Sequence, residues 1–391
     1  MPHATQPIDE LLRQATAAHT VPGVAAMAAT SDGVLYAGAF GTRSLATDAP
    51  MTLDTVCWIA SMTKAVTTVA AMQLVEQGRL RLDAPVQQWV QNLAAPQVLE
   101  GFDAAGTPQL RPATRPITLR HLLTHTAGFG YDMWNAPLAR YHEVTGLPRV
   151  NSGTLAALRL PLLFDPGERW NYGINIDWAG QVVEAVSGMR LDQYVQAHIC
   201  APLAMHDTVF RLSLTQQTRL ASVHQRGADG NLQPVSFAMP PEPECIMGGG
   251  GLYSTAPDYL QFAQMLLHGG SWHGAQILRP DTVALMAQNH IGDLAVTPMQ
   301  TVAPARSRDA DFFPGMPQKW GLSFLINTAQ APTGRAAGSL AWAGLGNTYF
   351  WIDRSTGVCG VFLTQILPFF DEAAIALFRA YETALYQSIA G

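Results

Sequence analysis

The spacing of hydrophobic and polar residues predicts a helix and then a β-hairpin at the start of the chain. The segment MPHATQPIDELLRQATAAHTVPG has the pattern of an amphipathic helix, with its charged residues grouped together. The following run, VAAMAATSDGVLYAGAFG, has small and branched residues on either side of Asp32-Gly33. Because Asp-Gly is a common hairpin turn, we expect two antiparallel strands that meet there.

A second helix is predicted from about Ser61 to Gln77. Apolar residues recur at three-residue spacing at positions 66, 69, 72 and 75, as expected for one helical face. Gly78 follows, and glycine often ends a helix because it adopts the left-handed conformation without strain. The sequence therefore places a helix shortly after the first strands.

Helical patterns dominate the middle of the chain, and strand patterns return near its end. From about Leu82 to Val235 the sequence is rich in Pro, Leu and helical segments such as TLRHLLTHT and DWAGQVVEAVSG. The last part contains the strand-like runs WGLSFLIN, SLAWAG and TYFWIDRSTGVCGVFLTQ, with a turn at residues 354–357, and then the helical run FFDEAAIALFRAYETALYQSI. We therefore expect a sheet built from both ends of the chain, with a helical region inserted between them.

The composition is that of a globular protein with a sizeable core. Of 391 residues, 48% are hydrophobic and 13% are charged, which excludes a disordered chain. The net charge of −6 argues against nucleic-acid binding, and no uninterrupted apolar run is long enough to cross a bilayer. The N-terminus lacks the basic start and apolar core of a signal peptide. The four cysteines are far apart, which is typical of buried free thiols in the cytoplasm.

The chain contains only two lysines, Lys64 and Lys319, and uses arginine for its other positively charged side chains. Lys64 lies three residues after Ser61, and residues at this spacing share one face of a helix. A serine hydroxyl becomes a nucleophile when a base removes its proton. Lysine can be that base if burial lowers its pKa towards neutrality, whereas arginine stays protonated. The alternative is an ordinary helix start, with Ser61 as the N-cap.

Two further segments carry candidate site residues, and each also has a purely structural interpretation. FDPGERWNYGINIDWAG places Tyr172 just before a helix, where it could share a proton with Lys64 or be a half-buried aromatic residue. GSLAWAGLGN places Trp342, Ala343 and Gly344 on a strand. The two small residues would let a substrate approach the strand backbone, or they could reflect tight packing in the core.

Two other patterns favour structural roles. His121 and His125 are four residues apart, but no third metal ligand is visible, so a role such as helix capping is expected. The glycines at positions 248–251 resemble a phosphate-binding loop, but no lysine follows them, which excludes a Walker motif. They predict a tight turn before a strand at Leu252-Tyr253.

These segments together resemble the serine hydrolases of the class C β-lactamase family, and most of all the branch of family VIII carboxylesterases. The resemblance rests on Ser61-Met62-Thr63-Lys64, Tyr172 and Trp342-Ala343-Gly344, in that order and spacing. Further matching segments are ITLRHLLTHTAGF, FDPGERWNYG and GGGGLYSTAPDYLQF. The resemblance spans about residues 8–388, which is nearly the whole chain.

The resemblance implies an α/β domain, with an antiparallel sheet flanked by helices, and an inserted all-α domain. We expect residues 1–81 and 236–391 to form the α/β domain and residues 82–235 the mainly helical one, with the active site in the cleft between them. In the family, the residue that matches Ser61 is acylated, and those that match Lys64 and Tyr172 transfer protons. The oxyanion hole would consist of the backbone N–H groups of Ser61 and Leu345.

Two departures from the family pattern favour neutral esters over β-lactams. Related lactamases and peptidases carry Lys-Thr-Gly or His-Thr-Gly at the position of Trp342-Ala343-Gly344, and their Lys attracts a substrate carboxylate. Trp342 offers an apolar wall without positive charge. The family motif Tyr-x-Asn is also broken, because Asn175 comes one residue late after Tyr172. This displacement argues against efficient recognition of a substrate amide.

We therefore predict a cytoplasmic serine carboxylesterase that hydrolyses small to medium neutral acyl esters through a Ser61 acyl-enzyme. No metal or organic cofactor is expected, and the binding partner would be the small-molecule ester, with neither nucleic acid nor membrane. If an alcohol or amine replaces water, the same site is an acyltransferase. Further alternatives are a β-lactamase or D-amino peptidase, and a non-catalytic penicillin sensor or scaffold. Tyr131 and Trp134 either line the acyl pocket or simply pack.

Overall fold

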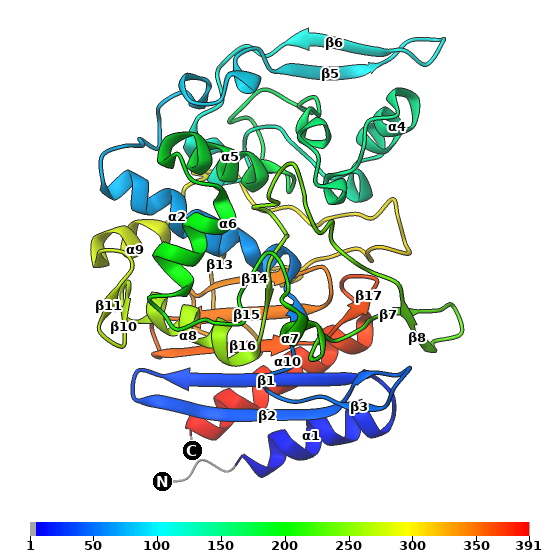
Figure 1. Ribbon diagram of the computed structural model, residues 1–391, viewed down its shortest axis with the longest axis vertical. Coiled ribbons are helices and arrows are strands. Elements are labelled where there is room, and N and C mark those ends of the chain that lie inside the picture. Colours follow the sequence, from blue (N-terminus) through cyan, green and yellow to red (C-terminus); the bar gives the residue numbers. More distant parts are fainter. Residues whose placement is uncertain (1–4, 391) are drawn as a thin grey trace.

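The centre of the protein is an eight-stranded antiparallel sheet, seen in a computed structural model that describes residues 5–390 (Figure 1). Ala26 pairs with Phe362, so a strand from the start of the chain lies beside one from its end. This confirms the expected antiparallel sheet flanked by helices. In spatial order, the strands are β12 (Gln318–Trp320), β13 (Leu325–Asn327), β14 (Leu340–Gly344), β15 (Thr348–Asp353), β16 (Val358–Leu363), β1 (Gly23–Thr30), β2 (Gly33–Ser44) and β3 (Ala49–Pro50).

Helices cover both faces of this sheet, which explains why its later strands are continuous apolar runs. Successive side chains of a strand point to opposite faces. On β15, Tyr349 and Trp351 pack against Phe378 of α10 (Glu372–Ala390). Phe350, between them, packs on the opposite face against Tyr259 of α8 (Ala256–Leu267). α1 (Gln6–Ala17) lies against α10, so the first and last helices are side by side (Figure 1).

The elements expected near the N-terminus are present. α1 begins at Gln6, while the first four residues of the predicted helical segment lie outside the described residues. The hairpin joins β1 and β2 through Ser31-Asp32, within one residue of the expected turn. None of the helices in residues 5–390 is long and apolar enough to span a bilayer.

The helix expected from Ser61 to Gln77 forms in two parts. A 3₁₀ turn, Ala60–Met62, comes first, and α2 (Thr63–Glu76) follows it directly. Every residue of α2 from Thr63 to Leu74 is buried, because the helix runs through the middle of the molecule and packs against α5 (Asn175–Ser187). This position explains how a lysine on α2 comes to lie inside the protein.

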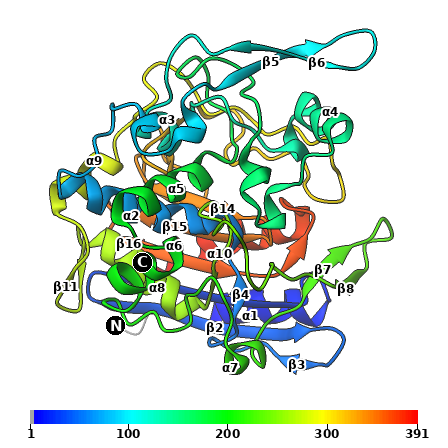
Figure 2. The same cartoon turned by 45° about the horizontal axis from the view of Figure 1, so that its top comes forward.

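The middle of the chain is mainly helices and turns. The hairpin β5–β6 and helices α4 and α5 lie on the side of the molecule away from β1 and β2 (Figures 1 and 2). Its last part joins the C-terminal region, because β7 and β8 form a small sheet with β17. The division into a domain of residues 1–81 and 236–391 and one of residues 82–235 remains a proposal.

The elements of the middle region and the remaining short strands and helices are β4 (Cys57–Trp58), β5 (Gln97–Phe102), β6 (Pro108–Pro112), α3 (Leu119–Leu123), α4 (Ala136–Thr145), α6 (Leu191–Val195), α7 (Leu214–Gln217), β7 (Val223–Arg226), β8 (Leu232–Val235), β9 (Tyr253–Ser254), β10 (Ser271–Trp272), β11 (Ala275–Gln276), α9 (Pro280–Met286) and β17 (Ile366–Leu367).

Local expectations from the sequence are confirmed with one difference. His121 caps α3, because its backbone N–H donates to the Thr118 hydroxyl while its ring accepts the Thr118 N–H. The four cysteines are buried and free. The segment WGLSFLIN is not one strand but parts of β12 and β13, which pair with each other. Ser323 between them adopts a φ of 71°, which turns the chain back on itself.

Candidate active site

Ser61 lies in a strained turn between β4 and α2. Ala60, just before it, adopts a φ of 45°, a left-handed conformation that costs a non-glycine residue about 1–2 kcal/mol. The Thr63 hydroxyl holds this turn, because it donates to the Ala60 carbonyl at 2.6 Å and accepts the N–H of Leu252 at 3.0 Å. The turn therefore presents Ser61 at the N-terminus of α2, where oriented N–H groups favour a developing negative charge.

Lys64 lies on the first turn of α2, and its side chain is 1% exposed. Its Nζ donates to Ser61 Oγ at 3.0 Å, to the Tyr131 hydroxyl at 3.1 Å and to the Gly249 carbonyl at 2.6 Å. These contacts use all three N–H groups of an ammonium. Burial lowers the pKa of Lys64 from 10.5 to about 7, although the Asp177 carboxylate acts in the opposite direction. Lys64 can therefore become a free amine near neutral pH and accept the Ser61 proton.

Two tyrosines flank the Ser61–Lys64 pair, and each has a different partner. Where the sequence analysis expects proton sharing between Tyr172 and Lys64, the structure gives Lys64 a hydrogen bond to Tyr131. The Tyr172 hydroxyl accepts the indole N–H of Trp342 at 3.0 Å, and Lys64 Nζ lies 4.7 Å from the centre of the Tyr172 ring. Burial raises the pKa of Tyr172 more than its hydrogen bonds with Ser61 and Trp342 lower it. The hydroxyl therefore keeps its proton at neutral pH.

β14 brings residues 342–344 against the Ser61 turn. A Cβ at Gly344 would lie 2.2 Å from the carbonyl oxygen of Ile59, so only glycine allows this approach. Of the two explanations that the sequence leaves open for the small residues, substrate approach and tight packing, the contact at position 344 favours tight packing against the Ser61 turn. Leu345 follows directly and lines the same cavity as Ser61. An oxyanion hole made of the N–H groups of Ser61 and Leu345 needs this proximity.

A small apolar cavity of about 10 Å³ lies beside Ser61, which is room for about one water molecule. None of the residues that line it carries a charge. Of the two aromatic residues expected at the acyl pocket, Trp134 lines this cavity, whereas Tyr131 binds Lys64. An uncharged group thus fits this site better than an anion. Besides Ser61, the walls are Trp134, Tyr172, Met299, Trp342, Ala343, Gly344, Leu345 and Phe369.

The irregular segment between α9 and β12 supplies Met299 to the wall of this cavity. The segment is fastened to the loop after residue 130 by two side-chain contacts. Arg306 makes two hydrogen bonds to the Asp132 carboxylate, at 2.7 Å and 3.2 Å, and the Trp134 indole N–H donates to the Ser307 hydroxyl at 3.0 Å. The segment that carries Met299 is therefore held in place by polar contacts of Arg306 and Ser307.

Asn175, the displaced asparagine of the family motif, does not line the cavity. Its amide nitrogen lies 3.0 Å from His125 Nδ1, and both side chains are fully buried. Burial, and to a lesser extent Lys64, holds the pKa of His125 well below 6.5, so the ring is neutral and its Nδ1 accepts the Asn175 amide. The His125 ring then packs against Tyr172, with 4.7 Å between ring centres.

Sequence reasoning missed Met299, Phe369, Asp177 and Gly249. Met299 and Phe369 lie in segments without a recognisable motif. Asp177, in the first turn of α5, is 1% exposed and accepts the N–H of Gly249 at 2.9 Å. An acidic residue within the otherwise apolar segment NIDWAG is the signal that could have identified it. The glycines at 248–251 do form the expected turn, but a turn pattern cannot indicate that Gly249 contacts Lys64.

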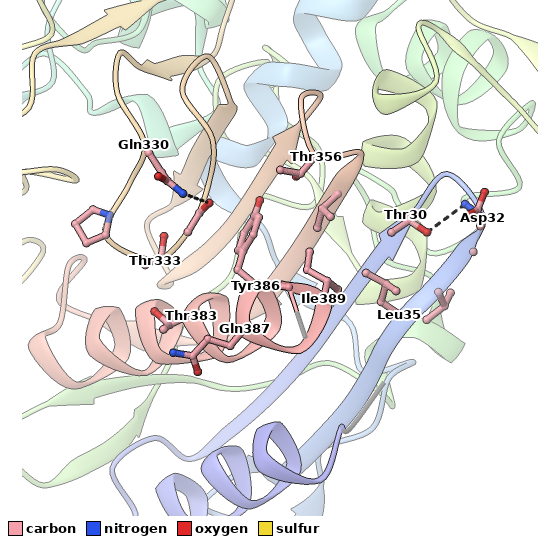
Figure 3. Close-up of a pocket in the computed structure, with 16 residues that line it drawn as sticks. Thr30, Asp32, Leu35, Gln330, Thr333, Thr356, Thr383, Tyr386, Gln387 and Ile389 are labelled. Carbon is pink, nitrogen blue, oxygen red and sulfur yellow. Dashed lines mark hydrogen bonds between the residues drawn. The ribbon is translucent and has the colours of Figure 1, made fainter. Parts of the chain in front are cut away.

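A larger cavity of about 830 Å³ lies elsewhere, between the β1–β2 hairpin, the loop at residues 330–334 and α10 (Figure 3). Its lining shares no residue with the cavity at Ser61 and includes Thr30, Thr333 and Tyr386. It holds no Ser, Cys, Lys or His that could act as nucleophile and base. Within residues 5–390, no group of three or more His, Cys, Asp or Glu side chains is arranged to hold a metal ion. Ser61 and Lys64 lie outside this larger cavity.

The chain is similar to known proteins over nearly its whole length. The family model described as Beta-lactamase matches residues 8–384. Monacolin J acid methylbutanoyltransferase of Aspergillus terreus is 34% identical over 97% of this chain and 95% of its own length. Lovastatin esterase of Penicillium rubens is 32% identical over 90% of this chain and 91% of its own. The solved structure of simvastatin synthase from Aspergillus terreus has a TM-score of 0.86 at 32% identity, covering 99% of this chain and 98% of that one.

The similarity covers nearly the full length of both this chain and these relatives, and it includes the segments that carry Ser61, Lys64, Tyr172 and Trp342. The relatives named above include an acyltransferase and an esterase. The chain therefore belongs to the β-lactamase family and is an enzyme of the serine hydrolase type.

Proposed function

We propose that this enzyme transfers a small neutral acyl group from an ester to an alcohol through an acyl-enzyme on Ser61, with hydrolysis as a side reaction. The sequence analysis ranks hydrolysis first and acyl transfer as its alternative. The relatives support the alternative better, because a methylbutanoyltransferase and a simvastatin synthase are among them. Membership of the family VIII carboxylesterases remains a prediction.

The observation that carries this proposal is the small, uncharged cavity beside Ser61. Trp134, Met299, Trp342 and Phe369 leave little room for water, and they offer no cation to a substrate carboxylate. An active site that excludes water protects a reactive acyl-enzyme from hydrolysis. A bound alcohol that displaces these walls can then attack the ester bond in place of water.

The proposed reaction has two matched halves. In the first, Lys64 takes the proton of Ser61 while its oxygen attacks the donor carbonyl, and the N–H groups of Ser61 and Leu345 stabilise the oxyanion. Collapse breaks the ester bond, and Tyr172 or the Lys64–Tyr172 pair returns a proton to the leaving alcohol. Where Tyr172 is the donor, Lys64 passes its proton on to Tyr172, so Lys64 is neutral again before the second half. In the second half, the acceptor alcohol loses its proton to the same base and attacks the acyl-enzyme, which releases Ser61.

A competition between alcohol and water tests the proposal. The enzyme is acylated with p-nitrophenyl butanoate, the adduct on Ser61 is located by mass spectrometry, and the products are quantified with increasing concentrations of neutral apolar alcohols. We expect the new butanoate ester to exceed free butanoic acid at millimolar alcohol. If Ser61 is labelled but only the acid forms with every alcohol, the enzyme is a hydrolase. If Ser61 is never labelled, the acyl-enzyme itself is wrong.

Substrate charge provides a further prediction. We expect kcat/KM for a neutral p-nitrophenyl ester to exceed that for nitrocefin by at least about 10²-fold, because no cation in the cavity compensates the carboxylate of the β-lactam. Trp342→Lys should raise kcat/KM for nitrocefin relative to kcat/KM for the ester. Trp342→Phe is the control, because it removes the indole without adding a charge. An unchanged ratio in Trp342→Lys would place the Trp342 side chain outside substrate contact.

A further inference from the structure

Asp177 is a buried carboxylate next to the catalytic base. It lies in the first turn of α5, and its side chain is 1% exposed. One of its oxygens accepts the Gly249 N–H at 2.9 Å, while the other, Oδ2, has no hydrogen-bond partner among the described residues. A buried carboxylate with one unpartnered oxygen is costly, so it needs a nearby positive charge to compensate it. Burial raises the pKa of Asp177 above its ordinary value, and the positive charge of Lys64 opposes this rise.

Gly249 links the two charged groups with its own backbone. Its N–H donates to Asp177, and its C=O accepts from Lys64 at 2.6 Å, the shortest of the three hydrogen bonds of Lys64. A Cβ at position 249 would lie 2.4 Å from Asp177 Oδ2, although the backbone there is outside the left-handed region. Glycine is therefore needed here for space, because any side chain would push the carboxylate away.

The other groups around Lys64 carry no charge at neutral pH. Tyr131 and Tyr172 face it, and burial raises the pKa of each hydroxyl. His125 is neutral, since burial and Lys64 lower its pKa. Near Asp177, burial also raises the pKa of the Cys245 thiol, which stays protonated. Asp177 is therefore the carboxylate whose charge acts on the base in this part of the described structure.

We propose that Asp177 is a positioning residue that acts through Gly249, orienting the Lys64 amine and setting how strongly it binds a proton. The inference rests on the proposed role of Lys64 as the base. During acylation the proton moves from Ser61 Oγ to Lys64 Nζ, and the Asp177 charge stabilises the ammonium that forms.

The presence of only two lysines allows a direct test without substrate. The protein is produced with lysine labelled with ¹³C at Cε, and the pH titration of each Cε signal is followed by NMR. Lys319→Arg leaves Lys64 as the single labelled residue and thereby assigns its signal. In Asp177→Asn the amide oxygen can still accept the Gly249 N–H, but the charge is removed. We expect the Lys64 titration midpoint to fall by at least about one pH unit.

Asp258→Asn is the matched control. Asp258 also lies in the first turn of a helix, α8, and accepts a backbone N–H, that of Asp207 at 2.7 Å, but it is not among the groups that act on Lys64. Its substitution should leave the Lys64 midpoint unchanged. If melting curves show that Asp177→Asn does not fold, Asp177→Ser keeps an oxygen acceptor in a smaller side chain and should lower the midpoint in the same direction. An unchanged midpoint in the folded variant overturns the proposal.

The same variants give a kinetic readout. In Asp177→Asn, the rate of Ser61 acylation by a p-nitrophenyl ester should reach its plateau at a lower pH than in the wild type. The plateau rate should be about 10-fold below that of the wild type, because the base is weaker. A merely structural defect would lower the plateau without moving the pH at which it is reached, and this result would also overturn the proposal. If wild-type Ser61 is not acylated, the proposed function is refuted instead. The NMR titration would still decide whether Asp177 sets the pKa of Lys64.

Discussion

Replacing Lys64 by Arg is expected to lower kcat/KM for a neutral p-nitrophenyl ester by at least about 10³-fold. Arginine keeps the positive charge but cannot release its proton, so it cannot accept the proton of Ser61. It also lacks space, because Lys64 is 1% exposed and all three of its N–H groups are already bound to Ser61, Tyr131 and Gly249. The measurement is steady-state kinetics together with the yield of the Ser61 adduct.

Lys319→Arg is the matched control for this experiment, because it makes the same change at the other lysine. Lys319 binds the carbonyl groups of Gly292 and Leu294 outside the cavity, so its substitution should leave kcat/KM unchanged. In the wild type, the rate should rise with pH through about 7, since only the neutral form of Lys64 accepts a proton. Near-normal turnover by Lys64→Arg, or a rate that falls with pH in this range, would remove Lys64 from the mechanism.

Tyr172→Phe is expected to lower kcat by about 10²–10⁴-fold at similar KM, the pattern for a group that acts mainly in the transition state. The Tyr172 hydroxyl interacts with Ser61 and Trp342, whereas the Tyr131 hydroxyl binds Lys64. If Tyr172 protonates the leaving alcohol, alkyl esters should suffer more than p-nitrophenyl esters, whose leaving group needs no proton. Because the ring stays in place, the melting temperature should change little.

Tyr131→Phe is the comparison that separates the two tyrosines. It removes one hydrogen bond of Lys64, and we expect a loss of only about 10-fold, of similar size for both kinds of ester. A larger loss on alkyl esters in Tyr131→Phe than in Tyr172→Phe would make Tyr131 the proton donor. If both variants fold and neither loses activity, the two hydroxyls have no catalytic role and the two rings only pack.

The parts of the site that could be predicted from sequence are those set by local geometry. Ser61 and Lys64 are brought together by one turn of a helix, and the family pattern fixes their spacing. The turn at 248–251 and the capping role of His121 likewise follow from residue types at short range. The strand-like runs near the end of the chain predict a sheet followed by a helix, which β12 to β16 and α10 confirm.

The parts that could not be predicted depend on long-range packing. Nothing local distinguishes Tyr131 from Tyr172 as the partner of Lys64, because the choice depends on how the loop after residue 130 sits beside α2. Asp177 reaches the base only through Gly249, which is far along the chain. Met299 comes from an irregular segment whose position is set by the Arg306–Asp132 ion pair, and such a contact leaves no periodic pattern.

The pairing of β1 with β16 has a consequence for how the molecule is made. During synthesis, the β1–β2 hairpin emerges early, and the free edge of β1 stays unpaired until β16, near the end of the chain, is made. Such late, non-local pairing slows folding and leaves an exposed edge open to association with other chains. We therefore expect refolding from denaturant to be slow and its yield to fall as protein concentration rises. Turnover of p-nitrophenyl esters should return only together with the completed sheet, because β14 of that sheet packs directly against the Ser61 turn.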